Sequence, residues 1–334
     1  MTVNHLPYPF KSIPLYKEKP WGGRKLEELF GKDLPEEKKT GEAWEVAAIP
    51  EGSSIIANGY MQGKSLAEAV EQWSVDLIGT SWNEINSFPL LVKILDAQED
   101  LSVQVHPGEE DCLKYFPDEH SKDETWIILD ADTDGAIYKG FEKDVIPKDF
   151  DEAIENNTVE KILRKIPVKR GDAVRIPPGI VHALKRGVVV LEIQQPSDST
   201  FRIYDYGRTP GGNPRELHLE EAKKVLRYSY DEQPFLIPDY MKAPFSNREL
   251  LIDCPAYRIE YWQFLENVML TEKPETVRII FVTEGRCRIE NHDIKINLKR
   301  GDTAVIPAVS HQIKLVPDGL AKVITTGAPG VNLL

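Results

Sequence analysis

The sequence predicts a mainly β protein in which one kind of β-domain occurs twice. Residues 169–184 read KRGDAVRIPPGIVHAL, and residues 299–313 read KRGDTAVIPAVSHQI. Each copy begins with a Gly-Asp turn, continues through β-branched residues typical of a strand, and reaches a proline that cannot continue a central strand. The histidine that follows each proline is expected to open the next strand. Because self-similarity at a long spacing indicates repeated domains, we expect two copies of one β-domain.

Composition and charge limit the kind of protein that this chain can be. It has 334 residues, 41% hydrophobic and 28% charged, which is typical of a globular protein with a large core. Its apolar runs are too short to cross a bilayer, and its first residues do not resemble a signal peptide, so we expect a cytoplasmic protein. The net charge of -13 argues against nucleic acid or an anionic membrane as a partner, because phosphates require a basic surface. An anionic small molecule would need a local basic pocket.

The three cysteines, Cys112, Cys254 and Cys287, are far apart in the sequence and form no C-x-x-C pair. Disulfide frameworks and thiolate zinc sites need paired or clustered cysteines, so neither is predicted. We expect three partly buried side chains that act as small hydrophobic groups.

The first predicted elements are short. Residues 14–23 read as an edge strand with a turn, and residues 24–30 as an amphipathic helix that ends at Gly31. Polar and apolar residues then alternate over 40–48, which predicts a strand with one face buried.

A helix is expected over 65–72, because Ser65 can cap it and Glu68 has the spacing of a capping box. The apolar run 88–95 predicts a buried strand that contains one lysine, Lys93. That lysine is interpreted either as a surface residue whose stem covers apolar side chains or as a functional residue.

Three polar side chains share one face of the strand predicted over 101–107. They are Ser102, Gln104 and His106, and the apolar residues between them share the other face. Such a polar face either meets water or lines a cavity.

Two further residues favour the cavity, although spacing alone does not show that the groups meet. His182 ends the first copy of the repeat, and Glu124 begins another alternating segment. Two histidines, a carboxylate and an amide oxygen on three strands suit Zn, Fe, Mn or Ni. Residues 171–182 also fit the pattern G-x5-P-x-G-x2-H, which resembles the second signature of cupin barrels.

The chain as a whole resembles the class I, zinc-dependent mannose-6-phosphate isomerases, in the short bacterial form built from two cupin domains. This resemblance implies a mainly β fold with two cupin (jelly-roll) β-barrels and helical insertions. The blocks Ser-Val-Gln-Val-His-Pro and Thr-Phe-Arg-Ile-Tyr-Asp are specific to this family among cupins. The matching segments are Trp21-Gly-Gly, Gly41-Glu-Ala-Trp-Glu, Phe88-Pro-Leu-Leu-Val-Lys, Asp100-Leu-Ser-Val-Gln-Val-His-Pro, Lys122-x-Glu, Pro177-x-Gly-x-x-His-Ala and Leu191-Glu-Ile-Gln-Gln-Pro-Ser-Asp-Ser-Thr-Phe-Arg-Ile-Tyr-Asp.

The resemblance also implies a set of site residues in the N-terminal cupin domain. One Zn2+ per chain would be bound there by four residues, Gln104, His106, Glu124 and His182. The catalytic residues would be Arg202 and Lys122. The residues that contact the substrate would be Trp21, Ser102 and Asp198, and Lys93 is added as a candidate because a phosphate requires local cations in an acidic protein.

Two departures from the cupin pattern are visible. The first cupin signature is usually H-x-H, whereas Gln104 takes the first position here, as it does in the isomerase family. In the second copy of the repeat, His311 has no such pair before it, and Glu284 is the best upstream acid. One histidine cannot hold a metal, so the C-terminal domain is predicted to be metal-free.

The domain boundaries follow from the repeat and from a Gly/Pro-rich segment after residue 208. We predict an N-terminal catalytic cupin domain over 1–208, a partly helical linker over 209–247 with a helix at 219–226, and a C-terminal cupin domain over 248–334. The acidic stretch 142–160 is expected to form one or two surface helices.

The predicted activity is that of an isomerase in mannose and carbohydrate metabolism, which interconverts mannose 6-phosphate and fructose 6-phosphate through a cis-enediolate. The partner would be the sugar phosphate alone, and the chain would be a monomer or a homodimer. Arg202 is a fixed cation suited to the enediolate, unless it only forms an ion pair with Asp198 or Asp205. Lys122 is one candidate for the base, with Glu45, Asp198 and a metal-bound water as competitors.

The group that binds the phosphate is left open among Lys93, Arg202 and Lys122. Two other functions are also left open at this stage. One is a metal-dependent cupin dioxygenase, and the other is a protein that binds a sugar phosphate without turnover.

Overall fold

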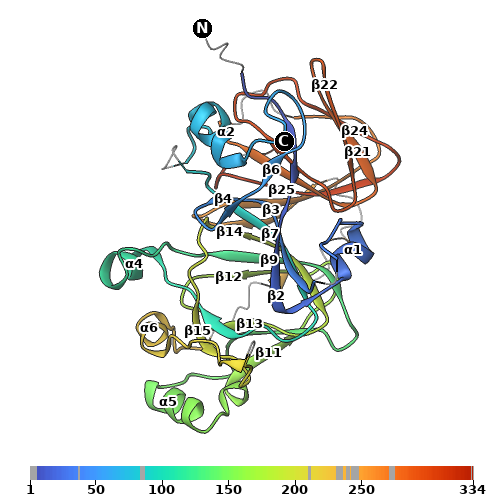
Figure 1. Ribbon diagram of the computed structural model, residues 1–334. Coiled ribbons are helices and arrows are strands. Elements are labelled where there is room, and N and C mark those ends of the chain that lie inside the picture. Colours follow the sequence, from blue (N-terminus) through green and yellow to red (C-terminus); the bar gives the residue numbers. More distant parts are fainter. Residues whose placement is uncertain are drawn as a thin grey trace.

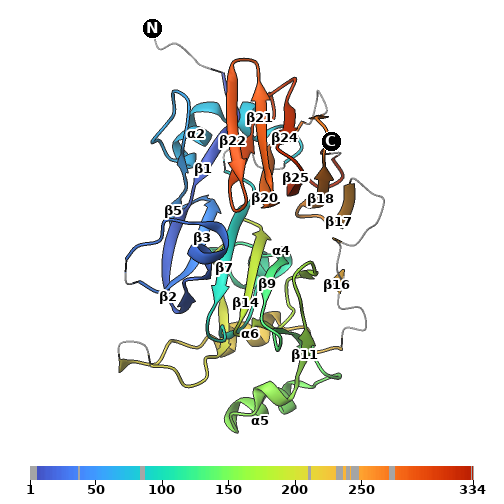
Figure 2. The ribbon, with the colours of Figure 1, turned by 90° about the vertical axis from the view of Figure 1, so that its right-hand side faces the viewer.

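Two β-barrels packed end to end form the chain (Figure 1). The computed structural model describes residues 6–36, 38–82, 87–209, 212–230, 236–237, 241, 248–270, 275–331 and 333. Every pair of neighbouring strands in them is antiparallel, and the sheets of the second barrel lie above those of the first in Figures 1 and 2. The predicted mainly β fold is therefore confirmed.

The first barrel contains two sheets. The seven-stranded sheet has the order β16 (Leu236–Ile237), β12 (Ala173–Ile176), β9 (Glu124–Ala131), β14 (Val188–Gln194), β7 (Leu91–Ala97), β3 (Thr40–Val46) and β2 (Leu15–Gly23). The five-stranded sheet has the order β11 (Leu163–Pro167), β10 (Ala136–Phe141), β13 (His182–Leu184), β8 (Val103–Val105) and β15 (Phe201–Tyr204). The predicted edge strand is β2, at the end of its sheet.

The second barrel is built in the same way. Its seven-stranded sheet has the order β17 (Arg248–Asp253), β18 (Arg258–Phe264), β25 (Ala321–Gly327), β20 (Arg278–Glu284), β23 (Thr303–Ile306), β1 (Phe10–Ile13) and β6 (Ile55–Ile56). Its four-stranded sheet has the order β19 (Val268–Met269), β24 (Lys314–Pro317), β21 (Arg286–Asn291) and β22 (Ile294–Lys299). A small hairpin joins β4 (Ala48–Ile49) to β5 (Gly52–Ser53).

The start of the chain belongs to the sheet of the second barrel, because β1 pairs with β23 and Phe10 lies opposite Val305. The sequence-based boundary assigns residues 1–208 to the first domain and so does not predict that β1 joins the sheet of the second barrel. The division into three segments otherwise stays a prediction. Of the expected linker, residues 210–211, 231–235, 238–240 and 242–247 lie outside the described part of the chain.

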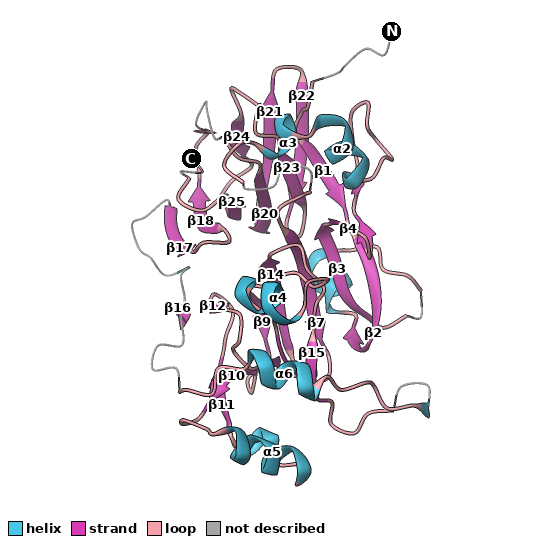
Figure 3. Cartoon of the chain, turned by 90° about the vertical axis from the view of Figure 1, so that its left-hand side faces the viewer, coloured by secondary structure: helices cyan, strands magenta, loops and turns pink. Residues whose placement is uncertain are grey.

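Short helices cover the edges of the sheets, with α2 and α3 beside the second barrel and α4, α5 and α6 beside the first (Figure 3). Their bounds are α1 (Lys25–Phe30), α2 (Leu66–Trp73), α3 (Val75–Ile78), α4 (Glu109–Tyr115), α5 (Pro147–Glu155), the 3-10 helix η1 (Val159–Lys161) and α6 (Leu219–Val225). The helices expected near 24–30, 65–72, 142–160 and 219–226 are confirmed. None of the helices in the described residues combines the length and hydrophobicity needed to cross a bilayer.

Local signals set the helix ends as predicted. The Ser65 hydroxyl accepts a hydrogen bond from the backbone N–H of Glu68 at 3.1 Å, and the Glu68 carboxylate accepts one from the backbone N–H of Ser65 at 2.8 Å. This is a complete capping box. Helix α1 ends at Gly31, whose φ of 60° is the left-handed conformation that glycine adopts without strain.

The prediction of a half-buried strand over 40–48 is wrong, because every residue of β3 is buried. Its alternate polar residues meet charged partners rather than water. Glu42 forms an ion pair with Lys19 at 2.9 Å, and Glu45 forms one with Lys32 at 2.6 Å. Glu42 and Glu45 lie on opposite faces of the strand, so both faces are buried and each carboxylate is compensated by a lysine.

The two copies of the repeat end differently. His182 is the first residue of β13, as predicted, whereas β24 begins only at Lys314, so His311 does not open a strand. The loop before His311 is held towards α3, because the backbone N–H of Ala308 donates to the carbonyl of Leu77 at 2.9 Å. His311 is exposed at the end of this loop.

The alternation of side chains along the strands places neighbouring residues in different hydrophobic clusters. On β9, Trp126 and Ile128 point into the core of the first barrel, while Ile127 points into a core shared by both barrels. On β20, Ile280 points into the core of the second barrel, and Ile279 points into the shared core. The two barrels are thus joined through buried apolar side chains, which favours a fixed arrangement.

The three cysteines behave as expected. Cys112, Cys254 and Cys287 are unpaired and buried. Burial raises the pKa of all three thiols, which makes them poor nucleophiles.

Candidate metal centre

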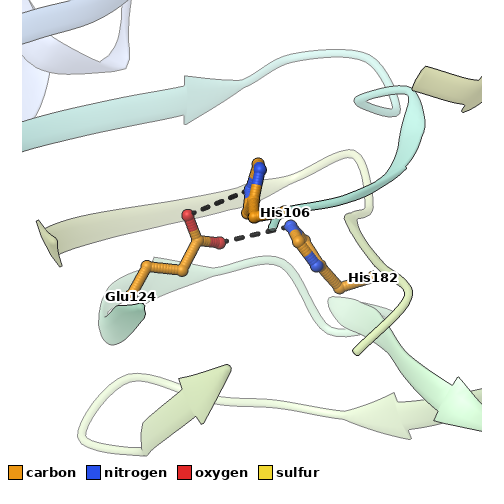
Figure 4. Close-up of side chains that lie close together, drawn as sticks. All are labelled: His106, Glu124 and His182. Carbon is orange, nitrogen blue, oxygen red and sulfur yellow. Dashed lines mark ion pairs between the residues drawn. The ribbon is translucent and has the colours of Figure 1, made fainter. Parts of the chain in front are cut away.

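Three buried side chains meet inside the first barrel, namely His106, Glu124 and His182 (Figure 4). One ligand atom from each lies within 4.8 Å of the others, and none of the three residues is more than 1% exposed. Among the described residues, this is the one group of three or more histidine, cysteine or carboxylate side chains with the spacing of a metal site.

The two sheets of the barrel bring these side chains together from opposite sides. His182 begins β13 and lies directly opposite Gln104 of β8, and His106 follows the end of β8. Glu124 begins β9 in the other sheet. Residues opposite each other on antiparallel strands project from the same face, so the sheet pairing fixes where these groups point.

Hydrogen bonds at the far side of each imidazole set its tautomer. His106 Nδ1 lies 2.8 Å from the carbonyl oxygen of Ser199, and His182 Nδ1 lies 2.8 Å from that of Ile180. A carbonyl only accepts, so each Nδ1 donates its proton. In a neutral ring the Nε2 atom is then an unprotonated acceptor, which is the form that binds metals.

These Nε2 atoms face the carboxylate of Glu124, which is also an acceptor. His106 Nε2 lies 3.4 Å from Oε2, and His182 Nε2 lies 3.3 Å from Oε1. Glu124 Oε1 and His106 Nε2 are buried without a hydrogen-bond partner, and Glu124 Oε2 has the Lys122 ammonium 3.0 Å away. Acceptors that converge in this way repel one another, and a cation between them would satisfy all of them.

The protonation states also suit a cation. Burial lowers the pKa of His106 to about 3, with a further contribution from Lys122, and burial lowers the pKa of His182 too. Burial alone would raise the pKa of Glu124, but Lys122, whose Nζ lies 3.0 Å from Oε2, holds it well below its usual range. Neutral histidines and an ionised carboxylate are the states that a metal requires.

Gln104 lies at the edge of this group. Its Nε2 is 3.3 Å from His182 Nε2 and can donate a hydrogen bond to it. A metal ligand would use the carboxamide oxygen instead, which changes places with the nitrogen by a half-turn about the last side-chain bond.

Arg202 projects from β15 directly opposite Gln104, on the strand next to β8. Its Nη1 donates to the carbonyl of Glu216 at 2.8 Å, and its Nε is buried without a partner. Burial, together with nearby Arg215, lowers its pKa from the ordinary value, yet the group stays a cation. Within the described residues Arg202 forms no ion pair, so the alternative of a structural pair with Asp198 or Asp205 is not supported.

Asp205 is instead shared by two arginines that sequence reasoning missed. Arg208 contacts Asp205 Oδ1, and Arg215 Nη1 lies 3.4 Å from the same atom. Arg202 is close enough for Arg208, Arg215 and Asp205 to influence its pKa, so three arginines lie near one carboxylate and leave a local excess of positive charge. The only sequence signal was three arginines within fourteen residues, which has no motif value by itself.

Lys93 is buried rather than exposed. It is 3% exposed, and its Nζ lies 3.5 Å from both Glu192 Oε1 and Asp198 Oδ1. Burial by itself would lower its pKa, but Glu192 and the other surrounding carboxylates raise the pKa above its ordinary value. The interpretation as a surface lysine is therefore wrong, because acidic neighbours compensate for its loss of water.

The remaining predicted residues are placed as follows. Trp21 and Ser102 are each 4% exposed, and Trp21 belongs to the hydrophobic core of the first barrel. Glu45 lies at the contact between the barrels, where it accepts a hydrogen bond from Thr303 Oγ1 at 2.7 Å. It faces away from the metal centre and is a poor candidate for the base.

In the second barrel Glu284 forms ion pairs with Lys322 at 3.0 Å and with Arg170 at 3.4 Å, and His311 is exposed. The metal-free state of this barrel stays a prediction.

Comparison with known proteins points to one family. Residues 10–139 match the family described as phosphomannose isomerase type I, catalytic domain. The mannose-6-phosphate isomerase ManA of Bacillus subtilis is 34% identical over 315 residues, covering 94% of this chain and 96% of the relative. The mannose-6-phosphate isomerase of Streptococcus mutans is 34% identical over 291 residues, covering 87% and 89%.

Solved structures agree in fold. The crystal structure of the mannose 6-phosphate isomerase from Bacillus subtilis has a TM-score of 0.84 and 31% identity, covering 96% of this chain and 99% of that chain. A mannose 6-phosphate isomerase bound with zinc and yttrium has a TM-score of 0.75 and 17% identity, covering 98% and 100%. The expectation of a two-barrel cupin fold is thereby confirmed.

Proposed function

Because the chain belongs to the type I phosphomannose isomerase family, we propose that it interconverts mannose 6-phosphate and fructose 6-phosphate. The observation that carries this proposal is the buried His106, Glu124 and His182 group, in which three unprotonated ligands converge and both His106 Nε2 and Glu124 Oε1 lack a hydrogen-bond donor. The relatives reported above are named as isomerases, which gives no support to a dioxygenase or to a protein that binds without turnover.

We assign the metal to four residues, namely Gln104, His106, Glu124 and His182. Two imidazoles, a carboxylate and an amide oxygen suit Zn2+, and a structural neighbour of the same fold is bound with zinc. One ion per chain is expected. When bound, it supplies a Lewis acid that offsets the negative charge that develops on the reacting oxygens of the sugar.

Arg202 would stabilise the enediolate. The isomerisation moves a proton from C2 to C1 of the sugar and shifts the carbonyl group from C1 to C2, so negative charge develops on both oxygens. Arg202 is held by its strand opposite Gln104. Its buried Nε has no hydrogen-bond partner, so this N–H group is free to donate to an oxygen of the substrate. A fixed cation beside that charge lowers the barrier.

Lys122 would carry the proton between C2 and C1. It is 4% exposed and lies 3.0 Å from Glu124, which supports a position beside the substrate. Asp198 and a water remain competitors, because a base is decided by its distance to the proton in the complex.

The sugar would be held by Trp21, Lys93, Ser102 and Asp198, and the phosphate by the arginines around Asp205. Lys93 is already matched by two carboxylates, Glu192 and Asp198, and therefore has little positive charge to offer a phosphate. Arg202, Arg208 and Arg215 are three cations near one carboxylate, Asp205. This group therefore suits a phosphate dianion better than Lys93 does.

The sugar phosphate is thus the proposed partner. The cytoplasmic location, the lack of nucleic-acid or membrane partners and the monomeric or dimeric state stay predictions.

The experiment that tests this function is NMR of the protein with mannose 6-phosphate in D2O, with and without a chelator. We expect fructose 6-phosphate to form, conversion to stop with the chelator, and deuterium at C1 and C2 to report exchange of the transferred proton. A zinc-loaded sample that produces no fructose 6-phosphate would exclude the isomerase.

A further inference from the structure

Among the described residues of the second barrel, Arg278 is a buried arginine whose side chain forms no hydrogen bond or ion pair. Arg278, the first residue of β20, is 1% exposed. Its Nε, Nη1 and Nη2 atoms are all buried and form no hydrogen bond. A guanidinium that is removed from water loses its hydration, and without partners it gains neither hydrogen bonds nor a counter-charge in return. Its burial is therefore unfavourable and requires an explanation.

The strand register of the two seven-stranded sheets identifies the residue of the first barrel that corresponds to Arg278. In the first barrel Ile176, the last residue of β12, lies opposite Glu124. In the second barrel Ile306, the last residue of β23, lies opposite Arg278. Ile176 and Ile306 are the same position of the repeated sequence, four residues after the Asp of each Lys-Arg-Gly-Asp. Arg278 is therefore the counterpart of Glu124.

The two side chains also point the same way. Glu124 shares its strand face with Trp126, which lies in the core of the first barrel. Arg278 shares its strand face with Ile280 and Val282, which lie in the core of the second barrel. Because side chains alternate along a strand, Arg278 points into its barrel just as Glu124 points into the first.

A second polar group on this inner face also lacks a partner. Thr325 lies opposite Ile280, so its side chain is on the same face, two residues along from Arg278. Its Oγ1 is buried without a hydrogen-bond partner. A guanidinium has only donors, and a hydroxyl can donate as well. Burial lowers the pKa of Arg278 to about 10, so the group is still charged at neutral pH.

We propose that the second barrel binds a compact inorganic anion at Arg278, at the position that corresponds to the carboxylate of the metal centre in the first barrel. The duplicated barrel would thus have exchanged a cation site for an anion site by reversing one buried charge. An oxyanion or a halide would provide the negative charge and the acceptors that the guanidinium and the Thr325 hydroxyl need.

The first test is thermal unfolding of the full chain in a buffer of large organic anions, titrated with sodium chloride or sodium bromide, because phosphate would also occupy the proposed substrate site. We expect one of these salts to raise the Tm of the wild type by about 2 °C or more, and Arg278→Met to abolish that rise. Arg288→Met is the matched control, because Arg288 is in the same barrel but is 40% exposed and pairs with Glu290 at 2.7 Å. An equal rise in wild type and Arg278→Met would assign the anion to another site and overturn the proposal.

The second test uses the unsubstituted protein, so it holds even where the variant does not fold. Crystals grown with sodium bromide as the only small inorganic anion should give an anomalous peak within hydrogen-bond distance of the Arg278 guanidinium. Density that shows this guanidinium contacting only protein atoms or water in such crystals would contradict the proposal.

Discussion

Arg202 lies directly opposite Gln104 on the neighbouring strand, so the proposed catalytic arginine and a proposed metal ligand project from one face of one sheet. His182 lies opposite Gln104 from the other side. The three residues form a row across β15, β8 and β13, and backbone hydrogen bonds fix their spacing. A site built on a sheet in this way holds its groups more rigidly than one built on loops.

The first prediction concerns the arginine of this row. Arg202→Ala should lower kcat for mannose 6-phosphate by about 10²- to 10³-fold, because a fixed cation beside the developing charge is lost. Zinc content, measured by mass spectrometry, should not change. Arg186→Ala is the control, since Arg186 is 71% exposed and should leave kcat unaltered. Turnover unaffected by Arg202→Ala would remove this residue from the mechanism.

The second prediction concerns the carboxylate of the metal centre. Glu124→Gln removes the only anionic ligand, and we expect zinc affinity to fall by at least about tenfold. Glu284→Gln, in the second barrel, serves as the matched control and should leave one zinc per chain. Equal loss of zinc from both variants would place a second metal in the C-terminal barrel.

The third prediction separates two roles of Lys122. Lys122→Arg keeps a positive charge beside Glu124 but cannot release a proton at neutral pH, whereas Lys122→Met loses both properties. If Lys122 carries the proton, both variants should lose kcat by about 10²-fold or more, with deuterium exchange at C1 and C2 lost as well. Recovery of turnover in Lys122→Arg alone would show that only the charge matters.

The fourth prediction is a pH dependence of stability at Asp96, which accepts a hydrogen bond from the backbone N–H of Lys25 at 2.8 Å. Burial raises the pKa of Asp96 from 3.8 to about 6. The folded state therefore holds this proton more tightly than the unfolded state, and the resulting stability is present below pH 4 and is lost as the pH rises towards 6.

Asp96→Asn removes this dependence. Relative to wild type, the variant should gain unfolding free energy between pH 4 and pH 7, by up to about 3 kcal/mol. Denaturant titrations at several pH values measure the difference. Asp134→Asn, at a carboxylate that is 71% exposed, should show no such trend. A difference between Asp96→Asn and wild type that is independent of pH would contradict the assignment.

Local features of the fold could be predicted from the sequence because they depend on neighbouring residues. The Ser65 and Glu68 capping box and the turn at Gly31 involve contacts of at most a few residues, and both were found as expected. The burial of β3 could not be predicted, because Lys32 reaches Glu45 only in the folded chain. The same holds for Lys93, whose acidic neighbours come from other strands and the loop after β14.

The candidate site was predictable in its residue types but not in its geometry. His106, Glu124 and His182 lie on three segments far apart in sequence, and only the resemblance to a family suggested that they meet. No sequence motif pointed to Arg208 and Arg215. Arg278 also escaped notice, because its importance depends on the register that places it opposite Ile306.

The central claim is that a single metal in the His106, Glu124 and His182 group makes this chain an isomerase. The most direct measurement is the rate of mannose 6-phosphate turnover as zinc is added to chelator-treated protein. We predict that the rate rises in proportion to added zinc and reaches a plateau at about one equivalent per chain. Full turnover in protein shown by mass spectrometry to contain no metal would contradict the claim.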